Sequence, residues 1–292
     1  MADRRRINGP TGTTLPPVFA EPPSQLPRKA TEDGSRKIFL RTGVTPSASG
    51  SAYMELENPN ASPGGLGGST RMKLTCTVHG PRALPRSAPF SPHMILTTHV
   101  KYAPFATRQR RGYLRDSSER DLGVHLETAL RGAIIADRWP KSGVDIIVTI
   151  IEGDQDRDAS DYQKEADWDM MNVLAGCITV ASAAIADAGI DCVDTVAGGV
   201  AAVVAKAGAD KPLIVLDPTS SDLDRVHAAC CTAYLPSRGE VTNIWFKGTL
   251  PGNGLSLYNE LLEKSLVACQ NAHHVVVKTL QDTVKQQQSD AT

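Results

Sequence analysis

The sequence predicts one α/β domain built of two similar halves, in which helices pack on mixed β-sheets. Two groups of short β-rich runs, bounded by Gly, Pro or Asn, lie in the early and the late parts of the chain. A segment with helical spacing follows each group. Between the two, the nearly continuous apolar run GVDIIVTIIEGD (143–154) is typical of a central strand.

Composition limits the class of protein. The chain has 292 residues, of which 41% are hydrophobic, enough for one large core or two modest ones. Its net charge of −1 gives no whole-chain argument for nucleic-acid binding, although a balanced total can hide local asymmetry. The six cysteines form no CxxC pair and mostly lie in apolar runs, which favours a reducing compartment. With no secretory signal and no stretch approaching a membrane span, we expect a soluble intracellular protein without a membrane partner.

The chain opens with a segment rich in Pro, Gly, Thr and charge (1–36), which predicts a flexible basic tail. Its Arg4, Arg5 and Arg6 either contact a phosphate or an acidic neighbour, or belong to a solvated tail. Strands are expected next, at 37–43, 51–58, 72–80 and 94–103. The Gly-rich stretch 59–71 predicts an exposed hairpin loop between the second and third of them.

After residue 116 the spacing of apolar residues changes from that of strands to that of a helix, and this change predicts the later elements. A helix is expected after residue 116, capped by Ser117 or Ser118, and the central strand at 143–154 follows it. The acidic insert 152–169 is either a solvated loop or a patch that docks a basic partner. A buried helix ends at Gly189, and a long helix closes the chain at about 255–287, before a disordered tail at 288–292. Between these helices, strands are expected at 194–207, 211–218, 228–236 and 240–250.

One stretch raises the question of metal or acid–base chemistry. LDPTSSDLDRVHAACCTAYLP (216–236) carries the side chains for either: Asp217, Asp222, Asp224, His227, Cys230 and Cys231. Adjacent residues of a strand point to opposite faces, so Cys230 and Cys231 cannot clamp one ion between them. We therefore expect neither a metal nor a cofactor here. Asp145 with Asp187 is a second candidate carboxylate pair, although turn and capping roles are commoner at such positions.

A basic loop is the main candidate for binding. KYAPFATRQRRGYLR (101–115) holds five basic residues and no acidic one, with aromatic residues between them. This mixture suits single-stranded RNA, bound through phosphate contacts and base stacking. The RNA-contact candidates are Arg108, Arg110, Arg111, Arg115 and, more weakly, Arg82, for which a structural salt bridge is the alternative. A solvated or subunit-facing basic loop is the alternative for the whole stretch.

Four quoted stretches carry a family resemblance. They are IFLRTGVTPSASGSAYMELEN with LTCTVHGPR, then WPKSGVDIIVTII, then AGCITVASAAIADAGI, and finally the stretch 216–248. Together they resemble the RNase PH family, whose members transfer the terminal nucleotide of RNA to phosphate, over about residues 37–284. Within that family, the chain is similar to ring subunits of the eukaryotic RNA exosome.

The resemblance implies a fold of two βαβα units and a long C-terminal helix. It implies a place in a six-membered ring, where this chain pairs with another RNase PH-like subunit. Oligonucleotide-binding cap proteins, a hydrolytic exoribonuclease subunit and RNA are the further partners it implies. The implied location is the nucleus, the nucleolus and the cytoplasm.

The resemblance also implies a degenerate catalytic site. Active relatives hold phosphate with a Gly- and Arg-bearing loop, whose nearest counterpart here is Ala175-Gly176-Cys177-Ile178. Their paired arginines before the first long helix fall on Ser117 and Ser118, and their catalytic aspartate falls on Ala229, with Asp222 nearby. We therefore expect a non-catalytic ring subunit. The alternatives are an active phosphate-dependent 3′-to-5′ exoribonuclease with a rearranged site, and a free-standing RNA-binding protein.

Overall fold

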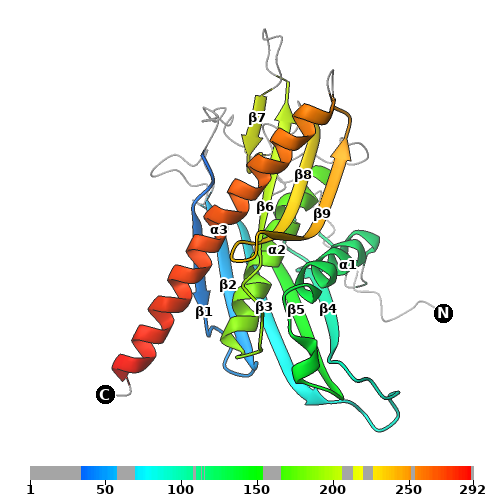
Figure 1. Ribbon diagram of the computed structural model, residues 1–292, viewed down its shortest axis with the longest axis vertical. Helices are drawn as coiled ribbons and strands as arrows, with labels where there is room; N and C mark the ends of the chain where they lie inside the picture. Colours follow the sequence, from blue (N-terminus) through cyan, green and yellow to red (C-terminus); the bar gives the residue numbers. More distant parts are fainter. Residues whose placement is uncertain are drawn as a thin grey trace, which may run out of the picture.

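The computed structural model describes residues 34–57, 70–107, 110–112, 114, 116–153, 166–205, 213–219, 226–250 and 254–290. Two β-sheets lie on opposite sides of a central helix, α2 (Ala166–Asp187), and a long helix, α3 (Gly254–Asp290), crosses one side of the molecule (Figure 1). The predicted class, an α/β fold with a long C-terminal helix, is therefore confirmed.

The first sheet has the order β1-β2-β3-β5-β4. Its strands are β1 (Ile38–Thr42), β2 (Gly50–Glu57), β3 (Thr70–Ala83), β4 (Ile95–Tyr102) and β5 (Ser142–Glu152). Only β4 and β5 are parallel, and the crossover between them contains α1 (Ser117–Arg131) and the short 3-10 helix η1 (Ala136–Arg138). Because parallel neighbours need such a crossover, the carboxyl ends of β4 and β5 meet the start of α1 at one edge of the sheet.

The second sheet has the order β7-β6-β8-β9 and is antiparallel throughout. Its strands are β6 (Ala197–Val204), β7 (Leu213–Leu216), β8 (Val226–Leu235) and β9 (Glu240–Gly248). The prediction of mixed sheets in both halves is thus correct for the first and wrong for the second. Among the described residues no helix separates these four strands, and the connection from β7 to β8 passes β6, which pairs with both of them.

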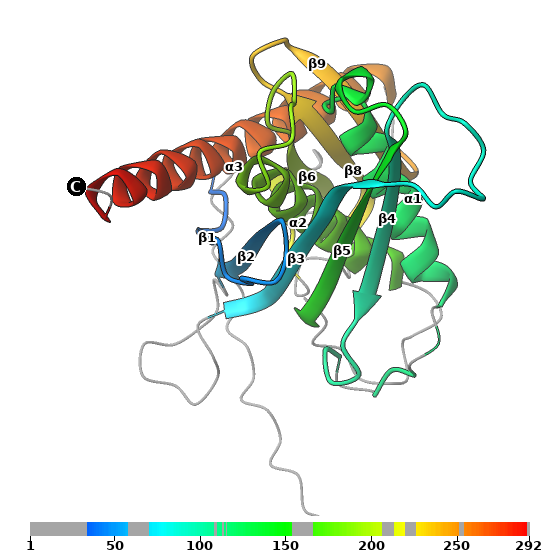
Figure 2. The ribbon, with the colours of Figure 1, turned by 90° about the horizontal axis from the view of Figure 1, so that it is seen from below.

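Strand β6 is buried on both faces, which explains its small residues. It passes between α2 on one side and α3 on the other (Figure 2). A Cβ added to Gly198 would lie 2.5 Å from the carbonyl oxygen of Ala175 in α2. A Cβ added to Gly199 would lie 2.5 Å from the backbone nitrogen of Cys269 in α3. The consecutive glycines therefore set how closely the two helices approach the sheet.

Helix α2 is the core of the fold. Its stretch Trp168–Asp187 is long and apolar enough to cross a membrane, and 94% of it is buried inside the protein. The prediction that no stretch approaches the length of a membrane span is therefore wrong. The apolar surface on all sides of this helix is explained by the sheets and helices that surround it.

Several predicted boundaries differ from the structure. The first tail was expected to extend to residue 36, yet Arg36 is buried and its backbone N–H donates to Asp217 at 3.3 Å. The acidic insert begins inside β5 and ends inside α2, while residues 154–165 lie outside the described part. Helix α3 continues to Asp290, through most of the tail expected to be disordered. Most of the predicted Gly-rich loop also lies outside the described residues.

Candidate functional site

The basic loop leaves β4 at the sheet edge where α1 begins. Tyr102, the last residue of β4, is fully buried, and burial raises the pKa of its hydroxyl. The guanidinium carbon of Arg111 lies 4.0 Å from the centroid of that ring, and the Arg111 N–H donates to the carbonyl of Pro104 at 3.1 Å. The loop therefore folds back on the domain. Arg110 is exposed beside it, while Arg108 and Arg115 lie outside the described residues.

The start of α1 is filled with carboxylates. Asp116 caps the helix, accepting the N–H of Ser117 at 2.7 Å, and Glu119 accepts the N–H of Asp116 at 3.1 Å. The prediction that Ser117 or Ser118 caps the helix is wrong by one or two positions, because a carboxylate precedes them. Both serine hydroxyls lie 3.4 Å from Asp116 oxygens. An incoming phosphate would meet these negative charges where active relatives place arginines.

Glu119 also joins α1 to the sheet. Its carboxylate is only 2% exposed and accepts the backbone N–H of Tyr102 at 2.9 Å. Two backbone donors thus hold one buried carboxylate between the end of β4 and the first turn of α1. The place where the family resemblance predicts an RNA-binding arginine pair is therefore organised around the buried carboxylate of Glu119.

The predicted phosphate-loop counterpart is not a loop. Ala175-Gly176-Cys177-Ile178 lies well inside α2, where backbone N–H groups bond to the preceding turn and cannot hold an anion. Cys177 is fully buried, and burial raises the pKa of its thiol to about 12, which keeps it neutral. The sequence itself predicts a buried helix here, because MMNVLAGCITVASAAIADAG (170–189) is apolar on nearly all sides.

Ala229 occupies the predicted acid position on β8. It is buried, and its partners in register are Ala202 of β6 and Lys247 of β9. A methyl group offers no proton to a leaving oxygen. Asp222, the nearby carboxylate, lies outside the described residues.

The paired cysteines point to opposite faces, as predicted. Cys231 packs in the main core, whereas Cys230 belongs to a smaller cluster under α3. Within the described ranges, no group of three or more His, Cys, Asp or Glu side chains is placed to hold a metal ion.

The remaining polar candidates are engaged elsewhere. Arg82 of β3 forms an ion pair with Asp145 of β5, which is the structural alternative expected for it. Asp187, at the end of α2, accepts the backbone N–H of Ser51 at 2.8 Å. Asp145 and Asp187 therefore serve separate contacts, and neither acts with the other as an acid–base pair.

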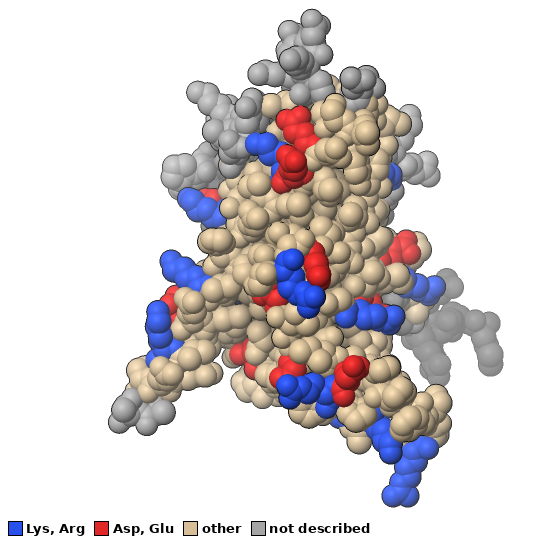
Figure 3. Space-filling view, in the orientation of Figure 1, with Lys and Arg blue, Asp and Glu red and all other residues tan. Residues whose placement is uncertain are grey.

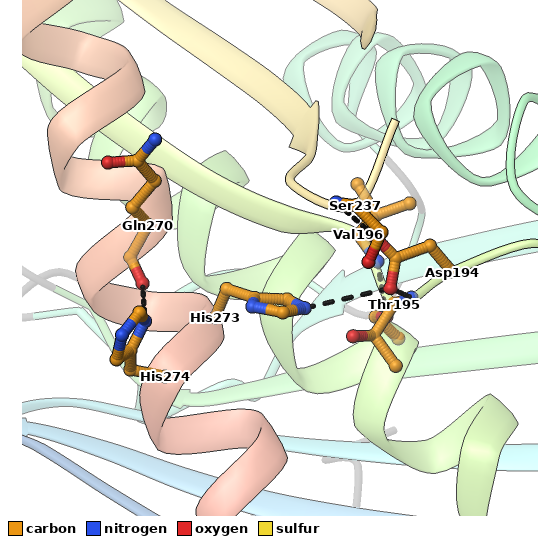
Figure 4. A network of polar contacts seen from close by, with 8 residues as sticks. Asp194, Thr195, Val196, Ser237, Gln270, His273 and His274 are labelled. Carbon is orange, nitrogen blue, oxygen red and sulfur yellow. Dashed lines mark hydrogen bonds and ion pairs between the residues drawn. The ribbon is translucent and has the colours of Figure 1, made fainter. Parts of the chain in front are cut away.

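A polar network around Asp194 was missed from the sequence (Figure 4). Its carboxylate accepts the N–H of Thr195 at 2.7 Å and that of Ser237 at 2.9 Å, and lies 3.7 Å from Nε2 of His273. Burial alone would raise the pKa of Asp194, but these donors and the nearby imidazole lower it overall.

The order of groups in this network excludes a serine relay. The Asp194 carboxylate lies between Ser237 and the imidazole and contacts both, so His273 is not placed to take a proton from Ser237. The network instead ties α3 to the segment before β6 and to the β8–β9 turn. The residues of this network are far apart along the chain, so no local sequence pattern predicts that they come into contact.

Comparisons with known proteins show which proteins the chain is similar to. Residues 34–191 match the 3′ exoribonuclease family, domain 1. Exosome complex component MTR3 of Chaetomium thermophilum is 63% identical over 289 residues, covering 97% of this chain and 100% of that protein. Exosome complex component MTR3 of Homo sapiens is 27% identical over 290 residues, covering 95% and 94%. The crystal structure of rice Rrp46 matches with a TM-score of 0.64 and 16% identity, over 87% of this chain and 98% of that one.

Proposed function

The chain belongs to the 3′ exoribonuclease (RNase PH) family, and we propose that it is a non-catalytic ring subunit of the RNA exosome. In this role it scaffolds 3′-to-5′ RNA processing and degradation and contributes to the wall of the RNA channel. The names of its relatives support exosome membership. The observation that carries the non-catalytic part is Ala229, a buried methyl group at the position of the family's catalytic acid.

Phosphorolysis needs groups that the described site does not supply. Phosphate must be held by cationic and N–H donors, and the leaving 3′-oxygen must receive a proton. At the start of α1, the described donors are already used by Asp116 and Glu119, whose charges oppose a second anion. A general acid alone contributes roughly 10²- to 10⁴-fold in rate. The arrangement therefore argues against phosphorolysis at this site.

One flank of the molecule suits pairing with a second RNase PH-like subunit. Strand β9 is the free edge of the second sheet, and Val241 and Ile244 on it are exposed. Val124 on the neighbouring helix α1 is 64% exposed. A free edge with exposed apolar side chains calls for a covering partner. Ile244 lies on the face of β9 toward α3, whereas α1, which carries Val124, packs on the opposite face. We name the edge of β9 between them, with Val124, Val241 and Ile244, the α1–β9 flank, and propose it as the edge that joins sheets with the paired subunit.

The remaining parts of the proposal follow from ring membership. Cap proteins that bind oligonucleotides would sit on the ring, and a hydrolytic exoribonuclease would receive the RNA that passes through it. The chain would then be found in the nucleus, the nucleolus and the cytoplasm. Imaging a tagged chain together with a tagged ring partner tests this distribution.

The activity test is a phosphate-dependence assay. Labelled single-stranded RNA is incubated with the purified chain, alone and with its ring partner, with and without inorganic phosphate. We expect no nucleoside diphosphates in any arm. Phosphate-dependent diphosphate release that disappears in Asp222→Ala, but persists in the matched control Asp224→Ala, would overturn the non-catalytic reading and identify a relocated acid.

A further inference from the structure

A cavity of about 390 Å³ lies between the first sheet, α2 and α3. Its lining residues come from the segment that leads into β1, from β2, β3, α2, β6 and α3, and from Asp217 after β7. In the described part of the chain, none of them belongs to β4, α1, β8 or β9, the elements around the basic loop and Ala229. The cavity is therefore separate from the degenerate catalytic site. Its volume is within the range of small-molecule sites.

The inner part of the cavity is apolar. Met54 of β2 and Met72 of β3 are at most 2% exposed, and they line the cavity together with Leu56. A Cβ added to Gly176 of α2 would lie 2.7 Å from the terminal methyl carbon of Met72 and 2.9 Å from that of Met54. The ends of methionine side chains adapt readily to an inserted group. This part of the cavity therefore suits a large apolar group.

The entrance of the cavity is polar and carries both signs of charge. Ser35 and Lys37 reach the surface, and Asn271 of α3 is exposed and donates to the Ser35 hydroxyl oxygen at 2.7 Å. Arg36 is only 5% exposed, and its backbone N–H donates to the carboxylate of Asp217 at 3.3 Å. A cationic and an anionic residue therefore line the cavity next to each other.

These two residues can contact a ligand while they keep their contacts within the protein. A carboxylate has about four lone-pair positions, and a guanidinium has several N–H donors. Asn172 of α2 also lines the cavity, and its amide nitrogen donates to the carbonyl oxygen of Pro218 at 2.7 Å, so the other end of this amide is an acceptor oxygen. The cavity thus offers donors and acceptors together.

The face of the molecule that α3 crosses carries charges of both signs. Figure 3 shows Lys and Arg side chains interspersed with Asp and Glu on this face. Lys37 at the entrance is itself paired with Glu57, 3.4 Å away. A highly charged anion such as a nucleotide phosphate would gain little from these charges and would be repelled by Asp217. A ligand without net charge is therefore favoured.

We propose that this cavity binds a free α-amino acid with a large apolar side chain. The side chain occupies the space beside the two methionines and Gly176, the carboxylate contacts Arg36, and the ammonium contacts Asp217. An α-amino acid carries its two opposite charges on one end of the molecule, which matches the adjacent cationic and anionic residues. An apolar carboxylate would place an anion against Asp217, and an apolar amine would place a cation against Arg36.

This site is a property of the single chain, so its presence or absence leaves the proposed ring function untouched. Isothermal titration calorimetry of the full chain at neutral pH measures the binding of L-phenylalanine. Phenylpropanoate lacks the ammonium, phenylethylamine lacks the carboxylate, and glycine lacks the apolar side chain. We expect saturable binding of phenylalanine and at least roughly tenfold weaker binding of each analogue, because each loses one contact. No saturable binding of phenylalanine, or equal affinity for any analogue, would overturn the proposal.

Asp217→Asn tests the contact with the ammonium. Asparagine tolerates the positive φ of 45° that Asp217 adopts, so the substitution removes the charge and keeps the shape. Phenylalanine should bind at least roughly tenfold more weakly, whereas phenylpropanoate should bind as well as before or better, because its carboxylate is no longer repelled. Asp121→Asn, at an exposed position of α1, is the matched control and should bind both like the wild type. Unchanged phenylalanine affinity in Asp217→Asn, or an equal loss of both ligands, would overturn the assigned contact.

Ala272→Leu tests whether the ligand lies in the cavity, since Ala272 is 5% exposed on the wall that α3 contributes. A ligand that binds only the folded chain raises its melting temperature. Phenylalanine should therefore raise the melting temperature of the wild type but not that of Ala272→Leu, whose larger side chain fills the space. Each protein is compared with itself, so a lower stability of the variant does not affect the test. An equal rise in both proteins would place the ligand elsewhere and overturn the proposal.

Discussion

The guanidinium of Arg111 lies over the buried ring of Tyr102, 4.0 Å from its centroid, whereas the neighbouring Arg110 is exposed. Two arginines that the sequence presents as equivalent therefore have different surroundings. One contributes to the packing of the loop against the end of β4. The other is free to move its guanidinium toward an RNA phosphate.

Arg110→Ala should weaken RNA binding by the assembled ring without destabilising the chain. Removing one phosphate contact lowers the slope of log affinity against log salt by about 1. Fluorescence anisotropy with labelled single-stranded RNA at several salt concentrations measures this slope. An unchanged slope would remove Arg110 from the RNA-contact candidates.

Arg111→Ala should lower the stability of the chain and leave the salt dependence of RNA binding unchanged, the opposite of what is expected for Arg110→Ala. The lost cation–π contact is worth about 0.5–2 kcal/mol of unfolding free energy, because the Tyr102 ring is buried and Arg111 is only partly exposed. The salt slope for RNA should stay at the wild-type value. Urea denaturation measures the first quantity and anisotropy the second, so a reduced slope with unchanged stability would contradict this assignment.

Asp116→Ala should lower the unfolding free energy by about 1 kcal/mol, the usual cost of losing an N-cap side chain. Asp116 accepts the first helical N–H of α1, and Glu119 bonds back to its backbone in a capping box. Ser118→Ala is the matched control, because that hydroxyl lies 3.4 Å from Asp116 and caps nothing. Equal losses for both substitutions in urea would contradict the observed cap.

The strands and the long helices could be predicted because their signals are local. The apolar run that became β5 and the small residues of β6 each identify a buried strand within a few residues of sequence. The start of α2 could not be predicted in this way, because its polar first turn resembles the acidic segment before it. As a result, the predicted buried helix begins at Met170, whereas α2 begins at Ala166.

Only those features of the candidate site that depend on the identity of a single residue could be predicted from the sequence. Ala229 stands where the family has its catalytic aspartate, and Ser117 and Ser118 stand where it has arginines. Each replacement can be recognised by comparing a single position with the family's motif. Contacts between distant segments have no such signal: Glu119 reaches the backbone of Tyr102, and His273 lies beside Asp194 across 79 positions, the difference of their residue numbers. Arg36, expected in the tail, is a further case, since its backbone N–H bonds to Asp217, which lies 181 positions further along the chain.

Gly199→Ala should destabilise the protein strongly, by about 1–3 kcal/mol as in other overpacked cores. The added Cβ would lie 2.5 Å from the backbone nitrogen of Cys269, so β6 and α3 would have to separate. Gly112→Ala is the control, because a Cβ there meets nothing within 4 Å. Thermal unfolding of the two variants gives the comparison, and equal melting temperatures would contradict the close approach of α3 to the sheet.

The buried thiol of Cys177 should make stability fall at alkaline pH. Burial raises its pKa from 9.0 to about 12, so between these values the thiol is deprotonated in the unfolded chain but neutral in the folded one. The unfolded state then binds fewer protons, and unfolding becomes easier as pH rises, by up to about 1.4 kcal/mol per pH unit. Below pH 9 the thiol is neutral in both states and contributes no slope.

Cys177→Ala should therefore show a shallower decline above pH 9 than the wild type, measured by urea midpoints at pH 8, 9, 10 and 11. Val180→Ala removes buried apolar atoms from the same helix without removing a titrating group, so its decline should run parallel to the wild type. Parallel declines for all three proteins would mean that the thiol ionises equally in both states. That result would require solvent to reach the interior of α2, which its complete burial between the two sheets excludes.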